Sequence, residues 1–311
     1  MKKLTKILST VFLAGLILAS CSVEGEDPDN SGSTDENTNQ AVENADLTIG
    51  VSISTLNNPF FIDIQNGIEE AAKNEEIELV ISDAQNDSSK QSNQIDDLIQ
   101  QKVDLLIVNP VDSQAISPSI ESANSADIPV IAVDRGSDSG EIVSLIASDN
   151  TEGGKMAGEY ILEKLGENPI VAQLEGIPGA SSTRERGEGF KQATEGKIDL
   201  VASQTANFDR AEAMSVMENI IQANPDIMAV FSQNDEMALG AIEALTNKDI
   251  LVVGFDGTDE AIESVKEGKL AATVAQKPEE MGKIAMETAI KYLNGEEVEE
   301  QISSPLELVT Q

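Results

Sequence analysis

The chain has 311 residues, 40% of them hydrophobic, and its 56 acidic against 20 basic side chains give a formal net charge of −36 at pH 7. It contains no His, no Trp, a single Cys and nine aromatic residues, seven Phe and two Tyr. These counts exclude a Ser-His-Asp triad, an imidazole zinc site and an internal disulfide framework, and the charge opposes binding to nucleic acid. At about 150 residues per domain the length suggests two domains, and catalysis is not favoured.

Residues 1–20 have the pattern of a signal peptide. Lys2, Lys3 and Lys6 precede an apolar run over 7–18, which is shorter than the ~20 residues that span a bilayer. Residues 18–21, Leu-Ala-Ser-Cys, resemble a bacterial lipoprotein cleavage box, and Cys21 is the one side chain there that could carry a thioether-linked lipid. We therefore predict an extracytoplasmic protein that is lipid-anchored to the cell membrane through Cys21. An ordinary secretory peptide with an incidental Cys is the alternative.

Residues 21–46 are predicted to be an acidic, disordered tether, because they have few large apolar groups and no basic residue. Asp27, Asp29 and Asp35 have the spacing of part of a calcium loop, but Thr38 stands where that loop needs Glu. We therefore predict no metal site here, nor a cofactor elsewhere in the chain.

The remainder alternates between strand-like and helix-like segments. In chain order we expect a strand over 47–54, a helix over 60–74, a strand over 77–82, a helix over 88–102, a strand over 104–109, a helix near 112–126, and strands over 129–134 and 142–147. Then follow a helix over 151–165, a strand over 170–175, a helix over 181–194, a strand over 200–204, a helix over 210–224, a strand over 228–232, a helix over 236–246, a strand over 250–255, a helix over 259–266, a strand over 271–275 and a helix over 279–293. This order predicts an α/β fold with two doubly wound parallel-sheet lobes, divided near residues 148–150.

Polar and aromatic side chains follow the predicted strands where each strand ends. They are Ser54, Asn58, Phe60 and Phe61, Asp134 and Arg135, Phe208, Asn234, Asp256 and Gln276, with Arg186 in the helix that follows 170–175. Ligands of such sheets bind beyond the carboxyl ends of the strands. Carboxylates, guanidinium groups and amides suit the adjacent hydroxyls of a sugar, and aromatic rings suit its C–H faces. Neither a G-x-G-x-x-G nor a Walker-type phosphate loop occurs.

Each of these residues also has a purely structural explanation. Phe60 and Phe61 could be core residues, and Asp134 with Arg135 could be a surface ion pair worth ~0–1 kcal/mol. Asn234 is a favoured helix N-cap, and Asp256 precedes a glycine as in many turns. The joint occurrence at successive strand ends favours a binding site.

Several long motifs resemble the sugar-binding proteins of bacterial ABC transporters, and the ribose-binding ones above all. They are Ser-Thr-Leu-Asn-Asn-Pro-Phe-Phe at 54–61, Ile-Pro-Val-Ile-Ala-Val-Asp-Arg at 128–135, Arg-Glu-Arg-Gly-Glu-Gly-Phe at 184–190, Asn-Phe-Asp-Arg at 207–210, Gln-Asn-Asp-Glu-Met-Ala-Leu-Gly at 233–240 and Val-Gly-Phe-Asp-Gly-Thr at 253–258. The similarity runs from about Leu47 to the C-terminus.

This resemblance implies the type I periplasmic-binding-protein fold, with two lobes joined by a three-strand hinge. It places residues 47–148 and 277–305 in the first lobe and residues 149–276 and 306–311 in the second. It implies a monomer that captures D-ribose by hinge closure and delivers it to an ABC-type permease. The implied ligand contacts are Ser54, Asn58, Phe60, Phe61, Asp134, Arg135, Arg186, Phe208, Asn234, Asp256 and Gln276.

Three other functions compete with this interpretation. The chain could be a sensor or chemoreceptor-type protein for another pentose, a hexose or a furanosyl signalling molecule. A sugar-responsive transcription regulator would need a helix-turn-helix where the signal peptide and tether stand. An enzyme such as a sugar isomerase or kinase is opposed by the absence of His and of a phosphate loop.

Overall fold

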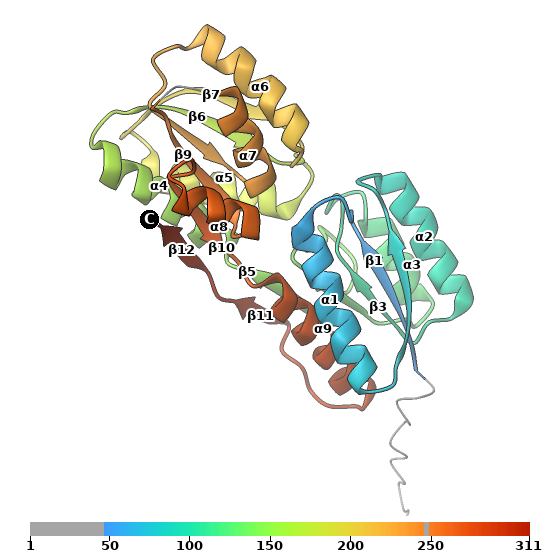
Figure 1. Cartoon of the computed structure of the whole chain (residues 1–311). Helices are drawn as coiled ribbons and strands as arrows, with labels where there is room; N and C mark the ends of the chain where they lie inside the picture. Colours follow the sequence, from blue (N-terminus) through green and yellow to red (C-terminus); the bar gives the residue numbers. More distant parts are fainter. Residues whose placement is uncertain (1–46, 246–248) are drawn as a thin grey trace, which may run out of the picture. The chain divides into compact units, whose positions relative to one another are not determined.

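The computed structural model describes residues 47–245 and 249–311. In this part of the chain the strands form two six-stranded sheets. The first has the order β11-β5-β4-β3-β1-β2, with all neighbours parallel, and the second has the order β12-β10-β9-β8-β6-β7, in which β12 alone runs antiparallel to its neighbour (Figure 1). The predicted fold class, two parallel-sheet α/β lobes, is confirmed.

The first lobe comprises the first sheet and four helices. Its elements are β1 (Thr48–Ile53), α1 (Pro59–Asn74), β2 (Glu78–Asp83), α2 (Ser88–Gln101), β3 (Leu105–Val108), α3 (Ser117–Ser125), β4 (Val130–Val133), β5 (Ser144–Ser148), α9 (Pro278–Leu293) and β11 (Gln301–Ser304). The second lobe comprises α4 (Asn150–Leu165), β6 (Ile170–Glu175), α5 (Ser181–Thr194), β7 (Asp199–Thr205), α6 (Arg210–Ala223), β8 (Ala229–Ser232), α7 (Asp235–Ala244), β9 (Leu251–Asp256), α8 (Asp259–Lys266), β10 (Ala272–Ala275) and β12 (Glu307–Thr310).

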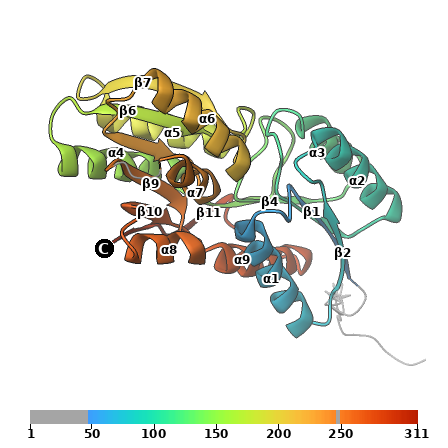
Figure 2. The same cartoon turned by 45° about the horizontal axis from the view of Figure 1, so that its top comes forward.

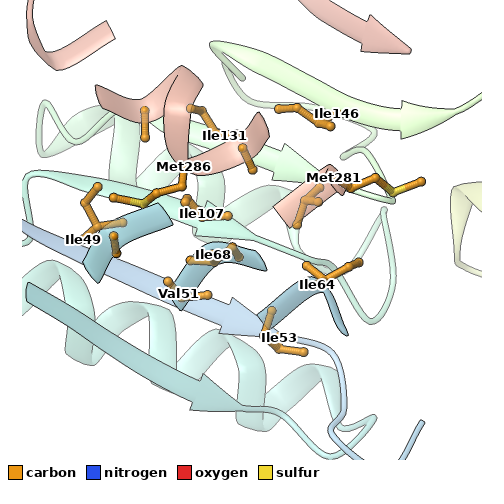
Figure 3. Packing of buried hydrophobic residues seen from close by; sticks show 14 of the residues in the cluster. Ile49, Val51, Ile53, Ile64, Ile68, Ile107, Ile131, Ile146, Met281 and Met286 are labelled. Atoms are coloured by element: carbon orange, nitrogen blue, oxygen red, sulfur yellow. The ribbon is translucent and has the colours of Figure 1, made fainter. Parts of the chain in front are cut away.

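Both faces of the first sheet are buried, which explains its uninterrupted apolar strands. All residues of β3 and β4 are buried. On one face Ile107 packs with residues of α1 and α9, as Figure 3 shows around Ile64, Ile68 and Met286. On the other face Leu106 and Val108 pack against α2 and α3. The alternation along β3 therefore fixes which helices cover which face.

Helices α1 and α9 pack closely together because each has a glycine at the contact. A Cβ at Gly67 would overlap the backbone of Glu279, and one at Gly282 would overlap the backbone of Ile64. This contact sets the middle of α1 against the first turns of α9, and the two helices lie side by side in Figure 1.

The second sheet is covered in the same way. Ala229 and Phe231 pack with residues of α4 and α5, and Val230 between them packs with residues of α6 and α7. Figure 2 shows these helices around the strands of the second sheet. The ring of Phe231 stacks on Phe190 of α5 with 4.6 Å between centroids. This stacking holds α5 against the sheet.

The structure differs from the sequence prediction in two elements. Helix α3 begins at Ser117 and not near 112, because the Asp112 carboxylate accepts hydrogen bonds from the N–H groups of Gln114 and Ala115 and forms a turn. Strands β11 and β12 follow α9, where no strand was expected, and add one strand to each sheet. Over residues 47–245 and 249–311 no helix is both long and apolar enough to cross a membrane.

Candidate functional site

A small cavity lies where the strand ends of the two lobes meet. The side chains around it nearly fill it, and they leave room for about one water molecule. Nine of the eleven predicted contact residues line it: Asn58, Phe60, Phe61, Asp134 and Arg135 from the first lobe, and Arg186, Phe208, Asn234 and Asp256 from the second. Residues separated by up to 198 positions therefore converge on one small cavity.

The start of α1 positions the two phenyl rings of the first lobe. Asn58 is the N-cap of the helix, and its side-chain oxygen accepts a hydrogen bond from the Phe60 N–H at 2.9 Å. Pro59 occupies the first helical turn, where it needs no N–H partner. The rings of Phe60 and Phe61 then meet edge to face, with an interplanar angle of 87°. Helix capping thus serves to orient an aromatic wall.

Arg135 is held between two aromatic rings and a carboxylate. Its guanidinium carbon lies 5.0 Å from the centroid of Phe61 and 5.1 Å from that of Phe208, and these rings belong to different lobes. Its Nη1 donates to the Pro110 carbonyl at 3.1 Å, and its Nε lies 3.3 Å from Asp134 Oδ2. Burial lowers the pKa of Arg135, although the Asp134 carboxylate opposes that shift.

Arg186 and Asp256 form the corresponding charged pair of the second lobe. Arg186 Nη1 lies 3.5 Å from Asp256 Oδ1, and the guanidinium stacks 3.8 Å from the centroid of Phe255. Gln276 Nε2 donates to the same carboxylate oxygen at 3.0 Å. Burial raises the pKa of Asp256 well above its usual value, against the lowering effect of Arg186.

Three cavity residues have backbones in sparsely populated regions. The φ angles are +66° at Asp134, +61° at Phe208 and +126° at Asp256. Positive φ is uncommon for residues other than glycine, and such conformations cluster at ligand sites, where the surrounding structure holds them. Asp134 directly follows β4, Phe208 lies in the loop after β7 and Asp256 is the last residue of β9, so all three line the cavity from strand ends.

Asn234 combines the structural role considered above with a place in the cavity wall. Its side-chain oxygen caps α7 by accepting from the Met237 N–H at 2.9 Å, and its Nδ2 lies 3.4 Å from the Phe208 carbonyl. The cap fixes the amide in one orientation.

Ser54 and Gln276 are buried beside the cavity without lining it. The Ser54 N–H bonds to Asn109 Oδ1 at 3.2 Å, and Gln276 reaches the cavity through Asp256. Two buried oxygens of the predicted set have no hydrogen-bond partner in the described residues, Ser54 Oγ and Gln276 Oε1, whereas Arg135 Nε has Asp134 as its ion-pair partner. Buried polar atoms are normally paired, so unpaired ones at one site indicate a polar ligand.

Sequence reasoning missed the residues that hold the contact residues in place. Asn109 Nδ2 lies 3.3 Å from Asp134 Oδ2, Asn150 Oδ1 accepts from Arg186 Nε at 2.8 Å, and the Gln233 carbonyl accepts from Arg186 Nη1 at 2.6 Å. Asn109, Asn150 and Gln233 all directly follow strands or begin helices, so the strand-end rule could have found them. Phe255, which lies under Arg186, gave no such signal because it lies inside β9.

A buried carboxylate, that of Asp235, supports the turn after β9. Its Oδ2 accepts from the N–H groups of Gly257 and Thr258, each at 2.8 Å, and its Oδ1 accepts from the Thr273 hydroxyl at 2.7 Å. Burial raises the pKa of Asp235 to about 6, although these hydrogen bonds act in the opposite direction. The arrangement fixes the chain next to Asp256.

Over the described ranges no group of three or more Asp, Glu, Cys or His side chains is arranged to hold a metal ion. The cavity instead offers paired carboxylate and guanidinium groups, amides and aromatic faces from two lobes. This fold and this site define a two-lobed binding protein for a small polar molecule.

Comparisons with known proteins identify the family. The model of the periplasmic binding protein domain matches residues 49–297. The ribose import binding protein RbsB of Bacillus subtilis (strain 168) is 50% identical, and that of Haemophilus influenzae 44% identical, each with 100% of both chains covered. A solved ABC transporter solute-binding protein of Bacillus halodurans C-125, with bound myo-inositol, is 38% identical with a TM-score of 0.81, covering 85% of this chain and 94% of that one. The chain therefore belongs to the periplasmic binding protein family, as its motifs predicted.

The members of this family that the chain resembles are sugar-binding transport proteins and not enzymes, which confirms the prediction that the chain is no enzyme. They are extracytoplasmic binding proteins, in agreement with the predicted location.

Proposed function

We propose that this protein captures D-ribose outside the cytoplasm and delivers it to an ABC-type permease in the cell membrane. The names of its relatives from Bacillus subtilis and Haemophilus influenzae support the sugar and the import role. The two lobes comprise residues 47–148 with 277–305 and residues 149–276 with 306–311. The protein acts as a monomer, without cofactor or nucleic acid.

The unpaired buried atoms around the cavity carry the proposal. Gln276 Oε1 is an acceptor, and Ser54 Oγ can donate or accept. A molecule with several hydroxyl groups suits both atoms, because each hydroxyl both donates and accepts. A carboxylate or phosphate ligand offers acceptors alone, and it would face the buried carboxylates of Asp134 and Asp256.

Aromatic rings complete the fit to a sugar. Phe60 and Phe61 belong to the first lobe and Phe208 to the second, and all three line the cavity. They supply apolar surface for the C–H faces of a sugar ring, while Asp134, Arg135, Arg186, Asn234 and Asp256 supply its hydroxyl partners. The small size of the cavity opposes a ligand larger than a monosaccharide.

The distribution of the contacts over two lobes explains capture. A sugar held by one lobe gains the contacts of the other only when the lobes close, so its differential affinity shifts the population to the closed state. A sugar lacking one hydroxyl would leave a desolvated protein group unpaired, at a cost of about 1–3 kcal/mol, or roughly 5- to 150-fold in affinity.

The proposed location rests on the N-terminal sequence. Cys21, in a segment outside the described residues, is the lipid attachment site, and the acidic stretch over 21–46 tethers the two lobes to the membrane. Two or more acyl chains on Cys21 would make this attachment stable.

Isothermal titration calorimetry on the purified protein tests the proposal. D-Ribose, 2-deoxy-D-ribose, D-allose and myo-inositol are titrated under identical conditions. We expect one site for D-ribose, with 2-deoxy-D-ribose binding at least fivefold more weakly. Preference for another pentose, a hexose or a furanosyl signal would support the sensor-type alternative, and the absence of heat with D-ribose would contradict the proposal.

A further inference from the structure

A set of contacts outside the cavity joins the two lobes. Ser113 N–H, from the loop after β3, donates to the Gly179 carbonyl of the second lobe at 3.0 Å. The Ser113 hydroxyl in turn accepts from the Ser181 N–H at 3.0 Å. Arg184 Nη2 bonds to Asp138 Oδ1 of the first lobe at 2.7 Å. None of these residues lines the cavity.

The bond to Ser181 completes the start of helix α5. The N-cap of this helix is Ala180, which has no side-chain oxygen to bind the free N–H groups of the first turn. Ser113 supplies that oxygen from the other lobe. Helix α5 also contains Arg186, which lines the cavity. The first lobe therefore caps the helix that carries this cavity residue.

The backbone at this contact comes unusually close to the opposite lobe. A Cβ on Gly179 would overlap the carboxylate of Asp112, which its bonds to the N–H groups of Gln114 and Ala115 hold in place. The φ angle of Gly179 is not among the positive ones, so alanine fits the local backbone. The three atoms nearest to that Cβ all belong to Asp112, so the approach of the first lobe favours glycine at this position.

We infer that Ser113, Asp138, Ser181 and Arg184 form an interlobe latch that sets the affinity and the residence time of the bound sugar. The latch forms only when the lobes close, and it must break before the sugar leaves. The latch therefore stabilises the closed state alone and slows the dissociation of the sugar. The inference rests on the proposed sugar binding.

The two parts of the latch differ in strength. The helix cap is a partly buried hydrogen bond, and loss of a cap corresponds to roughly three- to tenfold in affinity. Arg184 and Asp138 are each 45% exposed at the side chain, so their ion pair is screened by salt and contributes less than about threefold.

Variants of the full chain test the latch by calorimetry and by stopped-flow dissociation of D-ribose. We expect Ser113→Ala to weaken affinity three- to tenfold through faster dissociation, and Gly179→Ala to weaken it more than tenfold. Adding Asp112→Ala to Gly179→Ala should restore affinity, because it removes the overlapping carboxylate. The melting temperature without sugar should stay within about 2 °C of wild type in Ser113→Ala and Gly179→Ala.

Two controls separate the latch from general effects. Ser122→Ala removes a helix serine whose side chain bonds only within α3. Arg184→Gln, which removes the ion pair of the latch, should weaken affinity less than about threefold, and Lys266→Gln is its control with the same charge change in the second lobe. Both controls should bind like wild type. Wild-type affinity and dissociation rate in Ser113→Ala and Gly179→Ala would overturn the latch. Failure of the proposed function would give a different result, because wild type and controls would then bind another sugar of the panel in place of D-ribose. The affinities and dissociation rates of the variants would then be compared with that sugar.

Discussion

Replacement of Arg186 by Gln perturbs the charge balance of the cavity most directly. Three contacts place the guanidinium: Nε on Asn150 Oδ1 at 2.8 Å, Nη1 on the Gln233 carbonyl at 2.6 Å and Nη1 beside Asp256 at 3.5 Å. The two N–H groups of Nη2 make no hydrogen bond within the described residues and remain available to a ligand, since Arg186 lines the cavity. Hydrogen bonds to charged groups contribute about 1.5–3 kcal/mol each, so two predict a loss of at least about 100-fold in D-ribose affinity.

The same substitution should make stability more dependent on pH. Burial already raises the pKa of Asp256, and Arg186 is the cation that opposes the shift. In the variant the pKa of Asp256 in the folded state rises further. The folded protein then binds more protons than the unfolded chain over a wider pH range above the ordinary pKa of 3.8. Stability then falls as pH rises through that range. A buried carboxylate without its cation costs about 3 kcal/mol when charged. The variant should therefore be less stable than wild type by close to that value at pH 8, and the difference in unfolding free energy should be smaller at pH 5.

Calorimetry with D-ribose and urea unfolding at pH 5, 6.5 and 8 measure both effects. Arg210→Gln is the matched control, since it removes the same charge from the second lobe at a residue bonded to Glu236 and Glu260 and outside the cavity. We expect it to bind D-ribose like wild type. Binding by Arg186→Gln within threefold of wild type, or a stability gap that does not vary with pH, would refute the reasoning.

Three further predictions concern other parts of the chain. Gly176→Ala places a Cβ against the ring of Phe208, so D-ribose affinity should fall more than tenfold and the unfolding free energy should fall by about 1–3 kcal/mol. An unchanged calorimetric titration with D-ribose would contradict the role of that ring. Asp235 has a pKa of about 6 against 3.8 for an ordinary Asp, so wild type should lose about 2 kcal/mol of unfolding free energy relative to Asp235→Asn as pH rises from 4 to 6. A difference in unfolding free energy that does not change with pH in urea unfolding would oppose this. Cys21→Ser should release the protein from the membrane fraction, as cell fractionation would show; continued sedimentation with membranes would exclude the lipid anchor.

Periodicity and strand ends were enough to predict both lobes and most of the cavity. Asp134 and Asn234 follow buried parallel strands and Asp256 ends one, and parallel strands bring such positions to one edge. The assignment of sugar contacts to these residues stays a prediction, as do the exact lobe boundaries. Phe60 and Asn234 show that a residue with a structural role can also line the cavity, since Phe60 is buried core and Asn234 is a helix cap.

The parts that sequence could not predict depend on contacts between distant segments. Asn150 bonds to both Glu185 and Arg186, and no local pattern reveals a partner 35 or 36 positions away. The cap that Ser113 provides for α5 crosses 68 positions. Strands β11 and β12 are short, partly exposed segments whose pairing with β5 and β10 decides their conformation.

Direct titration of D-ribose into the purified full chain tests the central claim. The cavity, its unpaired polar atoms and its three phenyl rings predict one binding site per chain, with D-ribose preferred over 2-deoxy-D-ribose and myo-inositol. A titration without heat for D-ribose, or equal affinity for D-ribose and its 2-deoxy analogue, would contradict the account.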